Sequence, residues 1–202
     1  MIVIGLCGSS GSGKGYVCDI FKKYGVEYID TDKVYQKIAV GGSPCVRELC
    51  NFFGDEIINS DGSLNRKMLS KRVFEGDNAA QHLKMLNRIT HKYIREDVVR
   101  ILSEFERSGV KAAIIDAPVL FESGFDSLCH VTVCVTAPRD LKLQRILERD
   151  KITRHKAEAR IDSQLPDIRL RELCDYEIVN DGESNLDGEI IKVIRGIGIE
   201  EQ

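Results

Sequence analysis

Short apolar runs alternate along this chain with longer stretches in which apolar residues recur at helical spacing. The runs are bounded by turn residues, and they occupy residues 1–7, 26–29, 111–115, 130–135 and 176–179. Short, almost wholly apolar strands joined by helical segments are typical of a parallel sheet with helices on both faces. The pattern therefore predicts an α/β fold of three layers around a five-stranded parallel sheet.

A long helical stretch interrupts this alternation. No strand-like run occurs between residues 33 and 108, and helical periodicity covers residues 44–53, 66–74 and about 79–108. We interpret 33–108 as a helical insertion into one α/β domain that spans residues 1–202. The α/β core of the domain then consists approximately of residues 1–32, 109–138 and 165–202.

A glycine-rich turn joins the first strand to the first helix. Gly8, Gly13 and Lys14 have the spacing Gly-x4-Gly-Lys of a P-loop. Glycines allow successive backbone N–H groups to point inward, the helix adds its free N-terminal donors, and the lysine adds a mobile charge. The turn predicts a polyphosphate cradle and a fold like that of the P-loop nucleoside triphosphate hydrolases. The next residue, commonly a Ser or Thr that touches Mg²⁺, is Gly15.

Acidic residues follow two of the predicted strands. Ligands of open α/β sheets lie beyond the carboxyl ends of the strands, which is where Asp32 and Asp116 are expected. Near a phosphate cradle, one carboxylate can hold Mg²⁺ or its waters and another can accept the proton of an attacking hydroxyl. We expect Asp32 to be the base. The alternative is that residues 30–32 only cap the next helix and that Asp116 is only a turn residue.

Arginines recur on the helical stretch after residue 138. Arg145 and Arg149 are four residues apart on one helix face, and Arg160 follows in a helix that Thr153 can cap. Such arginines can close over a nucleotide, so residues of about 139–164 are interpreted as a lid. The alternative is a solvated face in which these arginines pair with nearby acids.

Composition restricts the class of protein further. The 202 residues are 43% hydrophobic and 30% charged with a net charge of −3, which fits a globular protein without a basic nucleic-acid footprint. No apolar stretch approaches the ~18 residues of a membrane span, and there is no signal-peptide layout. Seven cysteines without a Cys-x-x-Cys pair are interpreted as buried thiols. We expect a cytoplasmic monomer or weak homo-oligomer that binds neither nucleic acid nor membrane.

Further motifs extend along nearly the whole chain. They are Asp30-Thr-Asp32, Asp61-Gly-Ser-Leu-Asn-Arg66, Leu86-Asn-Arg-Ile-Thr-His91, Pro118-Val-Leu120-Phe-Glu122 and Asn180-Asp-Gly182. Their order and spacing resemble the dephospho-CoA kinase family of P-loop kinases. The resemblance implies transfer of the ATP γ-phosphate to the ribose 3′-hydroxyl of dephospho-CoA, with Mg²⁺ as the metal, giving coenzyme A and ADP.

The resemblance also implies roles for single residues. Lys14 would stabilise the β/γ-phosphate oxygens, Asp32 would deprotonate the 3′-hydroxyl, and Arg145 would act from the lid. Asp32 and Asp116 would hold the metal, mainly through water. The remaining contacts would be with ATP at Gly11, Ser12, Gly13, Gly15, Tyr16, Arg149 and Asn180, and with the acceptor at Arg66, His91, Pro118, Leu120 and Glu122. Taken alone, His91 also fits a structural, partly buried histidine.

The chain departs from the family pattern at two places. Gly15-Tyr16 replaces the Ser-Thr that follows the P-loop lysine, so a water would take the place of the hydroxyl ligand. The hypothesis is a slower or more Mg²⁺-demanding kinase. Lys92 stands where the family usually has a proline, which affects the helix bend near His91.

Two alternatives to a dephospho-CoA kinase stay open on the sequence. One is a P-loop kinase of another nucleoside- or nucleotide-like acceptor, with the same fold. The other is a catalytically weak nucleotide-binding protein that acts as a sensor, for which Gly15 is the main support.

Overall fold

The computed structural model describes residues 1–199 and divides the chain into two compact units. One unit combines Met1–Ile29 with the chain from Ser103 onward, and the other is Asp30–Leu102. Each unit has its own hydrophobic core, and each is described separately below.

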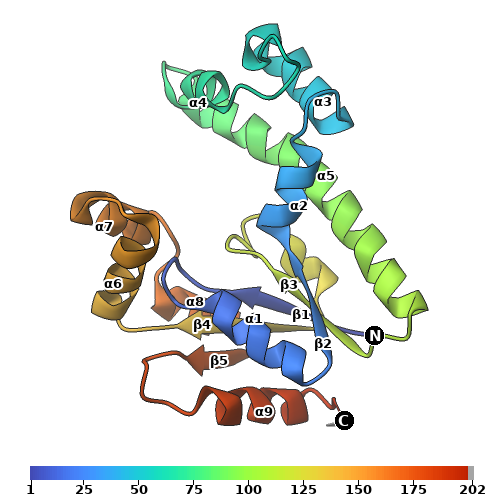
Figure 1. Cartoon of the computed structure of the whole chain (residues 1–202), viewed down its shortest axis with the longest axis vertical. Coiled ribbons are helices and arrows are strands. Elements are labelled where there is room, and N and C mark those ends of the chain that lie inside the picture. Colours follow the sequence, from blue (N-terminus) through green and yellow to red (C-terminus); the bar gives the residue numbers. More distant parts are fainter. Residues whose placement is uncertain (200–202) are drawn as a thin grey trace. The chain divides into compact units, whose positions relative to one another are not determined.

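The first unit is built on a five-stranded sheet with the strand order β2-β3-β1-β4-β5 (Figure 1). The strands are β1 (Ile2–Cys7), β2 (Val26–Asp30), β3 (Ala112–Asp116), β4 (Val131–Thr136) and β5 (Tyr176–Val179). β1 pairs in parallel with β3 and with β4, and β4 pairs in parallel with β5. The predicted parallel sheet is confirmed, with strand ends within one residue of those expected.

Helices cover both faces of this sheet. The helices α1 (Lys14–Lys23) and α9 (Leu186–Gly196) share one core with Val133 and Val135 of β4. The alternate residue Cys134 points to the opposite face, where it contacts Cys174 at the end of α8 (Asp167–Leu173). The three-layer arrangement follows from this alternation of side chains along buried strands.

Two further helices follow β4, and a short helix follows β3. The helices α6 (Arg139–Asp150) and α7 (Arg154–Asp162) pack on each other through Leu143, Ile146, Ala157 and Ile161. The Thr153 hydroxyl caps α7 as predicted, accepting from Lys156 N at 3.5 Å. The 3₁₀ helix η2 (Phe125–Leu128) contacts β1.

The second unit consists of helices joined by short loops, with one isolated β-bridge between Ile58 and Leu64. Its elements are α2 (Thr31–Ile38), α3 (Pro44–Phe53), η1 (Asp55–Ile57), α4 (Arg66–Phe74) and the long α5 (Ala79–Arg107), of which residues after Leu102 belong to the first unit. Ser43 and Asn65 cap α3 and α4 by accepting from Val46 N and Met68 N at 3.1 and 3.0 Å. The three predicted helical stretches are confirmed. None of the helices within residues 1–199 is long and apolar enough to cross a membrane.

Candidate functional site

The turn between β1 and α1 depends on its glycines, since a Cβ atom on Gly8 would lie 2.4 Å from the Val135 carbonyl oxygen and two further glycines are equally restricted. Gly11 and Gly13 have φ angles of 82° and 92°, in the left-handed region. A Cβ atom on Gly11 would lie 2.5 Å from the Lys142 carbonyl oxygen, and one on Gly13 would lie 2.1 Å from Asn180 Nδ2. The loop therefore lies in close contact with α6 and with the residue that follows β5.

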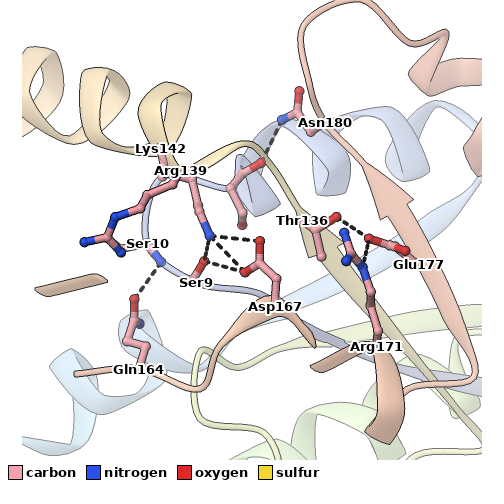
Figure 2. Close-up of polar contacts among 12 residues, drawn as sticks. Ser9, Ser10, Thr136, Arg139, Lys142, Gln164, Asp167, Arg171, Glu177 and Asn180 are labelled. Atoms are coloured by element: carbon pink, nitrogen blue, oxygen red, sulfur yellow. Dashed lines mark hydrogen bonds and ion pairs between the residues drawn. The ribbon is translucent and has the colours of Figure 1, made fainter. Parts of the chain in front are cut away.

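The carbonyl groups in the second half of the loop are held from outside. Arg145 Nη1 donates to the carbonyls of Gly11 and Ser12 at 3.2 and 3.4 Å. Asn180, which is labelled in Figure 2, donates from Nδ2 to the Ser12 carbonyl at 2.8 Å. Arg145 Nη2 also donates to Asn180 Oδ1 at 3.1 Å, which fixes both side chains. Because the Ser12 carbonyl faces Arg145 and Asn180, the N–H of the next residue, Gly13, is directed away from them, as an anion cradle requires. The Ser12 N–H itself donates to the Ser9 carbonyl at 3.1 Å.

The start of α1 is left for an external acceptor. Gly13 is the N-cap and supplies no side-chain hydrogen bond, and the first turn holds no acidic residue. The free N–H groups and the positive end of the helix dipole favour an anion at this point. Lys14, the first helical residue, donates from Nζ to the Gly8 carbonyl at 2.8 Å and is half-buried beside the loop.

A pocket of about 580 Å³ adjoins the loop. It is lined by Gly13, Tyr16, Arg145, Asn180 and the segment that follows β5, namely Gly182, Ser184, Asn185, Leu186 and Asp187. Backbone hydrogen bonds from Ser184 and Glu183 to Asp181 shape that segment and lower the pKa of Asp181, so its carboxylate stays ionised. The volume falls in the range of small-molecule sites, which is ~300–1,000 Å³.

The other two arginines of the predicted lid meet one carboxylate. Arg149 donates to Asp150 from Nε at 2.7 Å and from Nη2 at 3.0 Å, and Arg160 forms a further ion pair with Asp150. These hydrogen bonds, the one from Arg149 above all, lower the pKa of Asp150 to about 2. Arg149 thus has the acidic partner that the solvated-face alternative expects, whereas Arg145 binds loop carbonyls instead.

The sheet places Asp116 beside the strand that leads into the loop. It is the last residue of β3, and it is paired with Leu6 two residues before the loop begins at Gly8. Within residues 1–199 no group of three or more His, Cys, Asp or Glu side chains could hold a metal by itself. Mg²⁺ commonly uses one or two carboxylates together with phosphates and water. A carboxylate such as that of Asp116 therefore fits Mg²⁺ only if phosphate oxygens and water complete the coordination. Gly15 adds no hydroxyl, and its missing Cβ would meet nothing within 4 Å.

All seven cysteines are free thiols. The predicted burial is confirmed for four of them, whereas Cys50, Cys129 and Cys174 are half-buried. Cys7, the last residue of β1, has its Sγ 3.5 Å from Cys174 Sγ. A hydrogen bond with Cys174 and then burial raise the pKa of Cys134, so the Cys134 thiol stays protonated.

The helical unit carries three of the predicted site residues. Asp30 caps α2, its Oδ1 accepting from Lys33 N at 2.9 Å, so the capping alternative is correct for Asp30. Asp32 is exposed in the first turn of α2. Arg66, the first residue of α4, is exposed, with its guanidinium 6.0 Å from the Tyr35 ring centre.

His91 lies half-buried on α5. Burial lowers its pKa, which keeps the ring neutral at pH 7. Its neighbour Lys92, the second departure from the family pattern, donates from Nζ to Glu48 Oε2 at 2.8 Å. The Tyr93 hydroxyl donates to the same oxygen at 2.7 Å, so Lys92 ties α5 to α3.

The segment after β3 divides into buried and accessible residues. Leu120 is fully buried and packs against Gly5 of β1, so its side chain is part of the core. Pro118 is half-buried and Glu122 is exposed. A contact between the side chains of this segment and a substrate would therefore involve Pro118 or Glu122, and Leu120 could contribute only through its backbone.

Sequence reasoning missed a second set of residues on the loop. Lys142 and Asp167 meet Ser9 beneath the first half of the loop, and Gln164 Oε1 accepts from Ser10 N at 2.7 Å (Figure 2). The sequence held one signal for Lys142. It lies between Leu141 and Leu143 and one helical turn before Arg145, so it shares a helix face with that arginine.

The fold and this loop define a P-loop kinase: a parallel sheet whose first strand leads through a glycine-rich anion cradle into a helix, beside a pocket of nucleotide size. The chain belongs to the dephospho-CoA kinase family, because the family model described as Dephospho-CoA kinase matches residues 2–185.

Curated relatives and solved structures agree with this family. The chain is 38% identical over 183 residues to a dephospho-CoA kinase of Corynebacterium glutamicum, covering 90% of this chain and 92% of that protein. It is 31% identical to that of Lactobacillus johnsonii, covering 96% and 98%. A dephospho-CoA kinase structure from Campylobacter jejuni has a TM-score of 0.67 at 27% identity, covering 96% of each chain. Shikimate kinase from Acinetobacter baumannii, at 17% identity and a TM-score of 0.52 over 99% and 96%, shares the fold alone.

Proposed function

We propose that this chain transfers the γ-phosphate of ATP to the ribose 3′-hydroxyl of dephospho-CoA, giving coenzyme A and ADP. The observation that carries the proposal is the loop whose carbonyls are bound by Arg145 and Asn180, in a chain that belongs to the dephospho-CoA kinase family. With those carbonyls held, the N–H groups of the loop and of the first turn of α1 bind the triphosphate.

Different residues of the loop bind different parts of ATP. Lys14 leaves the Gly8 carbonyl to bind the β/γ-phosphate oxygens, where charge develops during transfer. Residues 11–16 bind the phosphate chain, and the pocket beside Asn180 takes the nucleoside. Arg145 keeps the loop in shape and places one cationic group next to the phosphates.

The acceptor is bound by residues of the helical unit. Asp32, exposed at the start of α2, orients the 3′-hydroxyl and accepts its proton. Arg66 and His91 bind the acceptor within that unit, together with Pro118 and Glu122 of the segment after β3. The lid of residues 139–164 brings Arg149 to the nucleotide once it exchanges Asp150 for phosphate oxygens.

Mg²⁺ is the proposed metal, and it neutralises phosphate charge when bound. Asp32 and Asp116 would hold it through water, and Gly15 supplies no ligand. The proposed setting is the cytoplasm, where the chain acts on small molecules as a monomer or weak homo-oligomer, without a nucleic-acid or membrane partner.

The test is ADP production with ATP, Mg²⁺ and dephospho-CoA, run beside adenosine and AMP as acceptors. Turnover that depends on dephospho-CoA is the expected result. Turnover with adenosine or AMP instead would make the chain a kinase of another acceptor. Tight ATP binding without turnover on any acceptor would favour the nucleotide-binding sensor that Gly15 suggests.

A further inference from the structure

A buried ion pair lies beneath the first half of the phosphate loop. Lys142 of α6 is only 5% exposed, and its Nζ lies 2.9 Å from both carboxylate oxygens of Asp167, the first residue of α8. The Asp167 side chain is itself 18% exposed. Removing such charges from water is costly unless the remaining donors and acceptors are satisfied.

Ser9 joins this ion pair to the loop. Its hydroxyl accepts from Lys142 Nζ at 3.1 Å and donates to Asp167 Oδ1 at 3.2 Å, and Ser9 is 4% exposed (Figure 2). The next residue, Ser10, gives its N–H to Gln164 Oε1, just before α8. Ser9 and Ser10 are therefore fixed by side chains from α6 and from the segment that begins α8.

The two halves of the loop are held by one helix. Lys142 and Arg145 are three residues apart on α6, so they project from the same face. Arg145 binds the carbonyls of Gly11 and Ser12, whereas Lys142 binds Ser9. Because Asp167 neutralises Lys142, the first half is fixed without a net charge beneath the bound phosphates.

We infer that Lys142 and Asp167 are positioning residues for phosphate binding, holding the first half of the loop through Ser9. The inference rests on the proposed function only in that the loop binds a polyphosphate. It does not depend on which acceptor receives the phosphate, so it is tested by binding as well as by turnover.

The experiment is calorimetric titration of the whole chain with inorganic tripolyphosphate and with ATP. Asp167→Asn is expected to weaken both affinities about tenfold, the effect of losing one hydrogen-bonded charge. In turnover assays the KM for ATP rises by a similar factor, while the KM for dephospho-CoA changes less than twofold. A merely structural role would not separate the two substrates.

Two further variants separate positioning from stability. Lys142→Met with Asp167→Leu replaces the ion pair by apolar side chains, which is often neutral for stability, so the melting temperature stays near that of the original chain. The affinity of this double variant for tripolyphosphate is expected to be as low as that of Asp167→Asn, because Ser9 has lost both hydrogen-bond partners. Ser9→Ala keeps the ion pair, cuts its link to the loop, and is expected to weaken tripolyphosphate binding about threefold to fivefold.

A matched control lies on the same helix. Arg139 of α6 pairs with Asp162 of α7 at 2.7 Å, with both side chains more than half exposed and neither bonded to the loop. Asp162→Asn is expected to change tripolyphosphate affinity less than twofold, as for exposed pairs in general.

Three results would overturn the inference. They are an Asp167→Asn variant that binds tripolyphosphate within twofold of the original chain, an equal loss in Asp162→Asn, or full affinity in the apolar double variant. Failure of the original chain to bind either ATP or tripolyphosphate would instead contradict the proposed function.

Discussion

Gly15 offers a quantitative test of how this chain holds its metal. It is the second residue of α1, it is exposed, and an added Cβ would meet nothing within 4 Å. Alanine or serine can therefore replace it without a steric clash. A glycine inside a helix costs about 0.5–1 kcal/mol relative to alanine, and each 1 kcal/mol shifts the melting temperature of a chain of this size by about 2–4 °C. We expect Gly15→Ala to melt about 1–4 °C higher, and Gly15→Ser to gain somewhat less.

Only the serine variant regains a hydroxyl for Mg²⁺. A hydrogen bond or ligand to a charged group contributes about 1.5–3 kcal/mol, and about 1.4 kcal/mol is a factor of ten. The Mg²⁺ concentration for half-maximal turnover should therefore fall about tenfold or more in Gly15→Ser. This Mg²⁺ concentration should stay within twofold of the original in Gly15→Ala, which has the same gain in helix stability but no hydroxyl.

The assay is coupled ADP production at saturating ATP and dephospho-CoA, titrated with Mg²⁺, for the original chain and both variants. Equal Mg²⁺ dependence in all three would refute the reasoning that the missing hydroxyl limits metal binding. A fall of the same size in both variants would assign the effect to the helix instead.

Three other predictions concern single residues. Asp32→Asn should lower kcat by about 10²–10⁴ in the coupled ADP assay at saturating ATP and Mg²⁺. A kcat within twofold of that of the original chain would contradict its role as a base. Asn180→Ala removes a donor from the Ser12 carbonyl. It should lower the free energy of unfolding in urea by about 1–3 kcal/mol and raise the KM for ATP. An unchanged KM for ATP would mean that the loop does not need Asn180. Burial lowers the pKa of His91 below 6.5, so the unfolded chain binds this proton more readily and stability is lost as the pH falls from above 6.5 through the folded pKa. The melting temperature should drop less between pH 7.5 and 5.5 in His91→Gln than in the original chain, and equal drops would contradict the assignment.

The elements of this fold could be predicted where a local signal marks their ends. Helix α3 begins after Ser43 with Pro44 at its first position and ends at Gly54, and α7 begins after Thr153, as its sequence indicates. The glycine-rich loop was also identified correctly, because its backbone requires residues of one type at fixed spacing.

The contacts that hold the loop could not be predicted in the same way. Arg145 and Asn180 meet only because the end of β5 lies beside α6, and no local pattern encodes that pairing. Lys142 looks like a solvated lysine until Asp167, 25 residues further on, is placed against it. Asp32, Arg66 and His91 stay predictions as acceptor residues.

The strand order has a consequence for the time course of synthesis. β1 pairs with β3, which begins at Ala112, and with β4, which begins at Val131, so both neighbours of β1 emerge long after β1 itself. At about 5–20 residues per second, a ribosome takes roughly 5–20 s to reach β3. The Asp30–Leu102 unit comes from one continuous stretch and can pack its core within that interval. The apolar strand that leads into the phosphate loop is thus made first and has no partner strand until β3 has been synthesised. It is the strand of the nascent chain that waits longest for a neighbour, and so the one most in need of protection from aggregation.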